Sequence, residues 1–217
     1  TVIAHIKQLS HQYRQDETAV QLIAVSKTFP SADIRTLYQQ GQRHFGENYI
    51  QEWSQKTDEL ADLDIIWHII GQVQSNKSRT VAEKAAWVHT IDREKIAKRL
   101  SEQRPVDCLP LNVCIEVNTS GNADKHGVNA ENVLALARQV GAMPQLRLRG
   151  LMCVPSHPED VKQLEQEFAL MQQLFKALQA DGLNVDTLSM GMSADMEQAI
   201  ASGATLVRIG TAIFGHR

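Results

Sequence analysis

The stretch "IAVSKTFP", residues 23–30, contains the kind of strand-to-helix junction that decides the fold of this chain. Residues 23–25 are apolar, as in a buried strand, and Pro30 is typical of the start of a helix. Lys27 stands at the end of the strand, where burying a charged side chain is costly unless it has a partner. The junction therefore poses two questions, how many such units the chain contains and what Lys27 does.

Strand-like and helix-like patterns alternate along the rest of the sequence. After a first strand at about 20–26, further strand-like segments lie at 44–48, 65–70, 87–91, 111–118, 146–154, 187–191 and 204–210. Helical patterns separate them, among them 129–140 and 158–180, and another precedes them at 2–13.

This alternation predicts a parallel sheet with helices on its faces, because the strands are apolar on both sides. An open doubly wound sheet is one solution. Eight near-regular repeats in 217 residues instead favour a closed (β/α)₈ barrel, or TIM barrel, with an extra N-terminal helix. We expect one domain over residues 1–217.

Composition argues against several functional classes. The net charge is -3 and no long basic run is present, so nucleic-acid binding is not indicated. No apolar run approaches the length of a membrane span, and the polar N-terminus is unlike a signal peptide. The three cysteines form no CxxC pair and the eight histidines show no HxxxH spacing. We therefore expect a cytoplasmic protein with no metal site.

The predicted barrel brings polar residues from different strands to one place. Active sites of TIM barrels lie at the carboxyl ends of the strands. The residues that follow the predicted strands are Lys27, Asn48, Gly71, Gln74, Asn118, the stretch 189–193, Gly210 and Thr211. They are expected to surround one mouth.

Lys27 is the first candidate for chemistry at this mouth. An apolar strand behind the lysine disfavours its charged form by desolvation. A neutral amine is a nucleophile that condenses with aldehydes to a Schiff base. The alternative is a lysine that extends to the surface or lies at the start of the next helix.

The loops after the last two strands are candidates for phosphate binding. Loops at these positions of TIM barrels often bind phosphate through backbone N–H groups. Ser189, Ser193, Gly210 and Thr211 offer hydroxyl groups and accessible amides. The alternative is ordinary turn chemistry, with Ser193 as the N-cap of the helix that follows.

Arg208 lies inside the last predicted strand, where a guanidinium is costly without a partner. It could form a structural ion pair or donate to a ring atom of a ligand. A Schiff-base lysine, a phosphate site and an arginine at one mouth together indicate pyridoxal 5′-phosphate (PLP). A Schiff-base aldolase of the same barrel class could share the lysine and the phosphate loops, but it does not need the arginine.

Seven motifs, in order along nearly the whole chain, resemble those of the pyridoxal phosphate homeostasis protein family. That family shares its barrel with the N-terminal domain of alanine racemase. The motifs are "AVSKT" at 24–28, "FGENYIQE" at 45–52, "WHIIGQVQSNK" at 67–77, "KHG" at 125–127, "LRGLM" at 148–152, "LSMGMSADMEQAI" at 188–200 and "VRIGTAIFG" at 207–215. One departure is Phe29, where many relatives carry lysine.

The resemblance implies a role for each candidate residue. Lys27 is expected to carry PLP as an internal aldimine, Asn48 to lie beside the cofactor ring, and Arg208 to contact the pyridine nitrogen. The phosphate is assigned to Ser189, Ser193, Gly210 and Thr211.

The same residues bear on whether the protein is an enzyme or a carrier. Arginine cannot accept a proton, so the pyridine nitrogen stays neutral and carbanions gain less help. Alanine racemase, which resembles this chain, takes its second base, a tyrosine, from a β-rich domain, and this sequence has no room for one after Phe214. Tyr49 is the one local candidate, and we expect it to pack under its loop.

We therefore expect a monomeric PLP-binding protein with little or no turnover and no catalytic residue. It would serve vitamin B6 homeostasis by buffering PLP or delivering it, with PLP-dependent apoenzymes as recipients. A small amino-acid racemase is the alternative.

Overall fold

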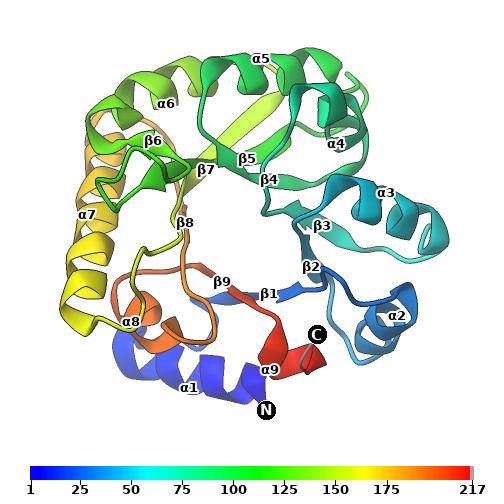
Figure 1. The fold of residues 1–217 in the computed structure, drawn as a ribbon, viewed down its shortest axis with the longest axis horizontal. Coiled ribbons are helices and arrows are strands. Elements are labelled where there is room, and N and C mark those ends of the chain that lie inside the picture. Colours follow the sequence, from blue (N-terminus) through cyan, green and yellow to red (C-terminus); the bar gives the residue numbers. More distant parts are fainter. Residues whose placement is uncertain (216–217) are drawn as a thin grey trace.

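The structure, a computed structural model that describes residues 1–215, is a closed barrel of parallel strands surrounded by helices (Figure 1). Eight strands form the ring in the order β4–β3–β2–β1–β9–β8–β7–β5, and β4 pairs with β5 to close it. The strands are β1 (Gln21–Val25), β2 (His44–Glu47), β3 (Ile66–Ile69), β4 (Trp87–Ile91), β5 (Leu111–Asn118), β7 (Leu146–Met152), β8 (Thr187–Ser189) and β9 (Leu206–Ile209). The predicted TIM barrel is confirmed.

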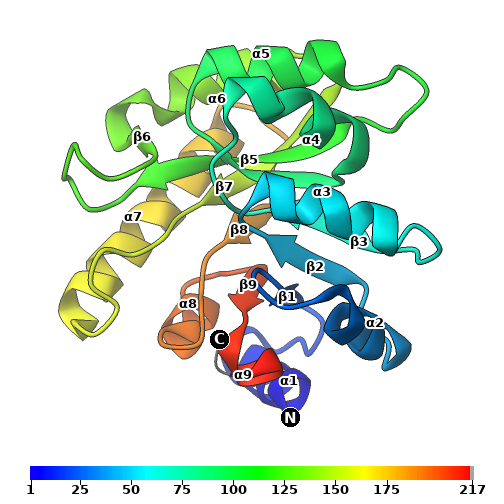
Figure 2. The same cartoon turned by 45° about the vertical axis from the view of Figure 1, so that its right-hand side comes forward.

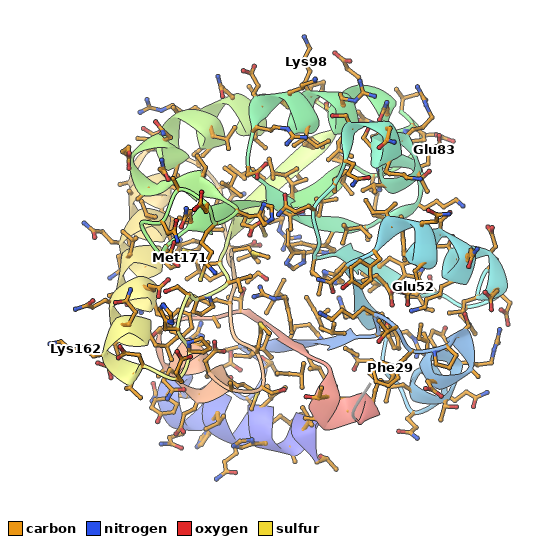
Figure 3. The ribbon with its side chains drawn as sticks, viewed as in Figure 1. Phe29, Glu52, Glu83, Lys98, Lys162 and Met171 are labelled. Carbon is orange, nitrogen blue, oxygen red and sulfur yellow. The ribbon has the colours of Figure 1, made fainter. Side chains whose placement is uncertain are left out.

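Helices cover the outside of this ring. They are α1 (Val2–Arg14), α2 (Ser31–Gln39), α3 (Ile50–Glu59), α4 (Ser78–Lys84), α5 (Glu94–Gln103), α6 (Val133–Gly141), α7 (Val161–Ala180), α8 (Met196–Ala201) and α9 (Thr211–Phe214). The predicted N-terminal helix, α1, packs against α8 and lies next to α9 in both views (Figures 1 and 2). Charged side chains such as those of Lys98 and Lys162 point outward from the helices (Figure 3).

Side chains along each strand alternate between the helices and the barrel interior. On β9, Val207 and Ile209 belong to the large core between strands and helices, whereas Leu206 belongs to a second, smaller cluster. Ile23 of β1, which is also in the smaller cluster, pairs in register with Arg208. This alternation places Arg208 inside the barrel although its neighbours in sequence are apolar.

Two helices begin later than predicted, one because of long-range strand pairing and one because of a local cap. Residues 128–129 form a short strand, β6 (Val128–Asn129), which pairs with the last two residues of β5. A 3₁₀ turn, η2 (Ala130–Asn132), follows, so α6 begins at Val133 rather than at residue 129. Helix α7 begins at Val161 rather than at residue 158, because the Asp160 side chain accepts a hydrogen bond from the Gln163 N–H and caps it.

Candidate functional site

A cavity of about 460 Å³ lies at the carboxyl ends of the strands. Its size is within the range of about 300–1,000 Å³ that is usual for small-molecule sites. Val25, Ile70 and Met152 supply part of its apolar wall. Six of the seven predicted site residues also line it, namely Lys27, Asn48, Ser193, Arg208, Gly210 and Thr211. The strand ends thus bring together residues that are far apart in sequence.

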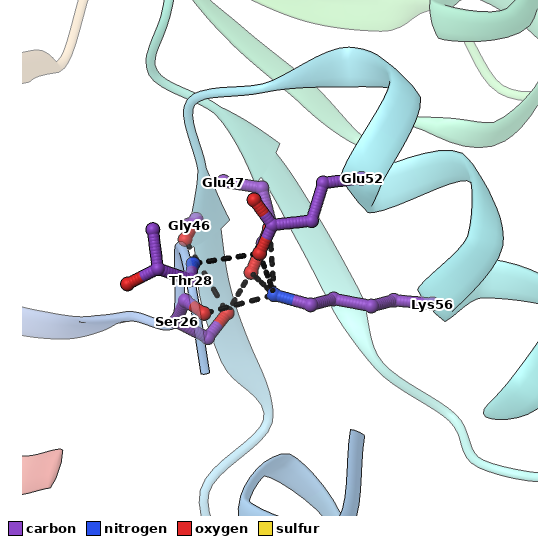
Figure 4. A network of polar contacts seen from close by, with 6 residues as sticks. All are labelled: Ser26, Thr28, Gly46, Glu47, Glu52 and Lys56. Atoms are coloured by element: carbon purple, nitrogen blue, oxygen red, sulfur yellow. Dashed lines mark hydrogen bonds and ion pairs between the residues drawn. The ribbon is translucent and has the colours of Figure 1, made fainter. Parts of the chain in front are cut away.

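Lys27 is half-buried at this cavity, and side chains of α3 hold the backbone on both sides of it (Figure 4). Before it, the Ser26 carbonyl oxygen accepts a hydrogen bond of 2.9 Å from Lys56 Nζ. After it, the Thr28 backbone N–H donates to Glu52 Oε1 at 2.6 Å. Thr28 has a φ of 67°, in the left-handed region that a β-branched residue rarely adopts. These contacts therefore fix a strained turn at Lys27.

A buried ion pair supports the turn. Lys56 Nζ lies 2.9 Å from Glu47 Oε2 and 2.8 Å from Glu52 Oε1. The Glu47 carboxylate, fully buried at the end of β2, also accepts a hydrogen bond from the Ser26 hydroxyl. Burial raises the pKa of the Glu47 carboxyl, whereas Lys56 and the Ser26 hydroxyl act against that rise. One lysine therefore joins two carboxylates and the strand that leads to Lys27.

Arg208 is buried and directs most of its donors to neutral oxygens. Its Nη1 donates to the Ser189 carbonyl oxygen at 3.0 Å and to Ser189 Oγ at 2.7 Å, and its Nη2 donates to the Cys153 carbonyl oxygen at 2.9 Å. Within residues 1–215 it forms no ion pair, so the predicted alternative of a structural ion pair is wrong. Burial lowers the pKa of the Arg208 guanidinium from its usual value, although nearby carboxyls of Asp195 and Glu116 oppose this.

Asn48 places an unsatisfied acceptor at the cavity. Its side-chain Oδ1 is buried and has no hydrogen-bond partner among the described residues. Leaving such an atom unpaired costs about 1–3 kcal/mol. The loop position depends on Gly71, because a Cβ there would lie 2.1 Å from the Asn48 backbone oxygen. A buried acceptor without a donor at a cavity wall is typical of a site completed by a ligand.

The loops after β8 and β9 contribute free hydroxyl groups. Ser193 and Thr211 line the cavity, and neither hydroxyl has a hydrogen-bond partner in the described part of the chain. Asp195, not Ser193, directly precedes α8, so the predicted alternative of Ser193 as its N-cap is wrong. Asp195 instead holds the loop, because its Oδ1 accepts a hydrogen bond of 2.6 Å from the Met192 N–H. Ser193 is thereby left available to a ligand.

Ser189 lies apart from the other predicted phosphate residues. Its side chain is buried inside the barrel and does not line the cavity. The Ser189 hydroxyl oxygen accepts from Arg208 Nη1 and lies 2.7 Å from His89 Nδ1. Its contacts therefore connect it to Arg208 rather than to the loop that contains Ser193.

Two aromatic residues near the mouth, Tyr49 and Phe29, have different surroundings. Tyr49, expected to pack under its loop, has a side chain that is 54% exposed and does not line the cavity. It directly precedes α3 and is exposed, so the expectation that it packs under its loop is wrong. Phe29 stacks on Phe214 with ring centroids 4.9 Å apart. This contact joins the turn after Lys27 to α9.

Four residues that shape the site, Glu52, Lys56, Asp195 and His89, were not predicted from the sequence. Glu52 and Lys56 lie within and just after the motif "FGENYIQE", but no periodicity shows that they reach back to β1. Asp195 looks like an ordinary helix-start residue, and His89 like a residue of a buried strand.

Residues 1–215 contain neither a cluster of metal ligands nor a membrane-spanning helix. No group of three or more His, Cys, Asp or Glu side chains there could hold a metal ion. None of the helices in this range is both long and apolar enough to cross a membrane. Cys108, Cys114 and Cys153 are free, and burial raises the pKa of the Cys114 and Cys153 thiols to about 12. These two thiols are therefore poor nucleophiles.

Solved structures are similar to the whole barrel. PipY of Synechococcus elongatus PCC7942 with PLP bound is 36% identical, with a TM-score of 0.85, and the match covers 99% of this chain and 100% of that chain. Alanine racemase of Corynebacterium glutamicum is 15% identical, with a TM-score of 0.76 over 99% of this chain and 61% of that chain. The second likeness shows the fold alone.

Comparisons of sequence give the same result. Residues 4–217 match the family described as alanine racemase, N-terminal domain. The pyridoxal phosphate homeostasis protein of Pseudomonas aeruginosa is 51% identical over 100% of this chain and 93% of that protein. The protein of the same name from Escherichia coli K12 is 48% identical over 91% of this chain and 86% of that protein. The chain therefore belongs to the pyridoxal phosphate homeostasis protein family, which has the fold of the alanine racemase N-terminal domain.

Proposed function

We propose that the chain binds PLP in the cavity, attaches it through Lys27 and serves PLP homeostasis. The observation that carries this proposal is that Lys27, which follows β1, and Arg208, on the adjacent strand β9, line one cavity. The names of the relatives and the PLP bound to PipY support the same ligand. We further propose that residues 1–217 form one PLP-binding domain.

The cavity residues fit the chemistry of PLP. When bound, PLP supplies an aldehyde that reacts with primary amines, a phosphate group and a pyridine ring. The Lys27 amine suits the aldehyde, and the Ser193 and Thr211 hydroxyls with the Gly210 amide suit the phosphate. The unpaired amide oxygen of Asn48 offers a further polar contact at the same wall.

Arg208 is the proposed partner of the pyridine nitrogen. Two of its five N–H donors have no hydrogen-bond partner among the described residues. Because a guanidinium only donates, it leaves the pyridine nitrogen without a proton and limits the electron withdrawal of the ring. We propose that Ser189 contributes to the site by holding Arg208, and not by contacting the phosphate.

The same arrangement favours a carrier, meaning a protein that holds PLP without turnover, over a racemase. A racemase needs a second base opposite the lysine, and exposed Tyr49 does not line the cavity. Among the described residues, Lys27, Arg208 and Asp195 are the titratable groups that do line it. The Asp195 carboxylate is engaged with the Met192 N–H. We therefore propose buffering or delivery of PLP, with PLP-dependent apoenzymes as recipients and a monomer as the working form.

Exchange of the α-proton of amino acids with solvent tests the carrier function. The PLP-loaded protein is incubated with L-alanine and separately with D-alanine in D₂O, and loss of the α-proton signal is followed by NMR. We expect exchange no faster than with the Lys27→Ala variant mixed with the same PLP. Rapid exchange with both enantiomers, absent in Lys27→Ala, would establish the racemase instead.

A further inference from the structure

Three histidines form a hydrogen-bonded chain across the barrel interior. His44 of β2, His68 of β3 and His89 of β4 lie on neighbouring strands. His44 Nδ1 lies 2.9 Å from His68 Nε2, and His68 Nδ1 lies 2.9 Å from His89 Nε2. His89 Nδ1 then lies 2.7 Å from Ser189 Oγ, which is itself 2.7 Å from Arg208 Nη1. This histidine chain (His44, His68 and His89) thus leads to a residue of the cavity.

Arg208 and the Ser189 hydroxyl hydrogen together set the direction of the hydrogen bonds in the chain. Arg208 can only donate, so Ser189 Oγ must accept from it. Within residues 1–215 the remaining partner for the Ser189 hydroxyl hydrogen is His89 Nδ1. That nitrogen then carries no proton, and the His89 proton is on Nε2.

The same reasoning applies to the rings of His68 and His44. His89 Nε2–H donates to His68 Nδ1, so the His68 proton is also on Nε2, and His68 Nε2–H donates to His44 Nδ1. With this direction, all three rings are the neutral Nε2–H tautomer. A doubly protonated ring anywhere would either place two donors face to face or leave the Ser189 hydroxyl hydrogen without an acceptor.

The surroundings favour neutral rings. Burial lowers the pKa of His44 and lowers those of His68 and His89 well below the usual value. The positive charge of Arg208 lowers the pKa of His89 further. The Trp87 ring stacks on His68, with centroids 5.3 Å apart and planes 20° apart, which limits reorientation of that ring.

We propose that the histidine chain acts through Ser189 to hold the Arg208 guanidinium in one orientation at the cavity. The chain fixes the Ser189 hydroxyl hydrogen on His89, which leaves the oxygen lone pairs to Arg208 Nη1. His89 and Ser189 are therefore positioning residues. The claim that this orientation strengthens PLP binding rests on the proposed function, whereas the claim that Arg208 is held in one orientation does not.

Ring-nitrogen NMR of the ligand-free protein tests the direction of the chain. With ¹⁵N-histidine labelling, His68 and His89 should each show a protonated Nε2 and an unprotonated, hydrogen-bonded Nδ1. In Ser189→Ala the His89 Nδ1 signal should move toward that of a free acceptor. Ser101→Ala, at another buried serine, is the control and should leave these signals in place. Protonated Nδ1 atoms in the wild-type protein would overturn the proposal.

Signals of the arginine side chain test the positioning itself without PLP. The Arg208 Nη protons should be resolved in the wild-type protein and averaged by rotation in Ser189→Ala and His89→Leu. His89→Asn keeps an acceptor near the place of Nδ1 and should restore the resolved signals. Unchanged Arg208 signals in both Ser189→Ala and His89→Leu would overturn the positioning role.

PLP binding supplies the last comparison. Ser189→Ala and His89→Leu should bind PLP about tenfold more weakly, the effect of losing one hydrogen bond to a charged group, and His89→Asn should not. Wild-type affinity in the first two variants would contradict the role of this orientation in binding. Failure of the wild-type protein to bind PLP would refute the proposed function alone, because both NMR measurements use the free protein.

Discussion

The backbone N–H of Thr28 donates to Glu52 Oε1 at 2.6 Å, so a carboxylate of α3 holds the residue that follows Lys27. Thr28 has a left-handed φ of 67°, a conformation that costs of the order of 1–3 kcal/mol for such residues. Structures keep strain of this kind where surrounding contacts fix it, often at functional sites. This hydrogen bond links the motif "FGENYIQE", residues 45–52, to Lys27, the lysine proposed to bind PLP.

Removing that carboxylate should disturb Lys27 without unfolding the barrel. In Glu52→Ala the turn can relax, and we expect PLP to attach about tenfold more slowly, because a rise of roughly 1.4 kcal/mol in the activation free energy lowers a rate tenfold. The attachment rate is measured by the visible absorption of bound PLP. Adding Thr28→Gly should restore much of the rate, because glycine adopts positive φ without strain. The control is Glu83→Ala at an exposed glutamate (Figure 3). A wild-type rate in Glu52→Ala would contradict this account of the turn.

Lys56 should matter for stability because it neutralises a fully buried carboxylate. In Lys56→Met, Glu47 loses its cation, and we expect the free energy of unfolding to fall by about 3–5 kcal/mol. The double variant Lys56→Met with Glu47→Gln removes the charge as well and should recover most of that loss. Urea denaturation measures both. Equal losses in the single and double variants would show that buried charge is not the cause.

Gly71 should be required for the position of Asn48. A Cβ at residue 71 would lie 2.1 Å from the Asn48 backbone oxygen, so Gly71→Ala must move this loop. We expect PLP affinity to fall about tenfold or more, as for a lost polar contact. Gly141→Ala is the matched control, because a Cβ there meets only the ends of two side chains, Leu183 at 3.3 Å and Leu148 at 3.9 Å. Equal affinities of the two variants would exclude this role of Gly71.

The buried histidines predict how stability depends on pH. Burial lowers the pKa values of His44, His68 and His89 in the folded protein. The unfolded protein therefore binds protons at these histidines at a higher pH than the folded protein does. The stability that the neutral histidines contribute is present above the unfolded pKa of about 6.5 and is lost as the pH falls toward the folded pKa values. Each such histidine can reduce the free energy of unfolding by at most about 1.4 kcal/mol per pH unit in that window, and half-buried His44 by less.

A comparison of variants isolates this effect, because other groups act in the opposite direction. Burial raises the pKa values of Glu47, Glu116 and Asp195, so their contribution is lost as pH rises through the folded values. His44→Asn should make the fall in the free energy of unfolding shallower as the pH drops below ~6.5. His5→Asn, at an exposed histidine, should not change it. Identical slopes in the two variants would refute this assignment.

The barrel could be predicted from the sequence because its strands are apolar on both faces and each is followed by a helical pattern. The start of α6 was predicted too early because of a long-range pairing. Residues 128–129 pair with the end of β5, and no local pattern marks this.

The residues at the mouth could also be predicted, since their position after each strand fixes where they lie. The contacts beneath them could not. His44, His68 and His89 meet because the strand register turns each ring into the barrel, and register is not visible in a single sequence. Ser189 was grouped with Ser193 by sequence, although it faces the barrel interior.

Chemical trapping tests the central claim, the attachment of PLP to Lys27, most directly. The PLP-loaded protein is reduced with borohydride, digested and analysed by mass spectrometry. Lys98→Ala, at an exposed lysine, is the control variant and Lys27→Ala the test variant. We predict one phosphopyridoxyl group on the peptide that contains Lys27, in the wild-type protein and in Lys98→Ala. A label on another lysine, or undiminished labelling in Lys27→Ala, would contradict the account.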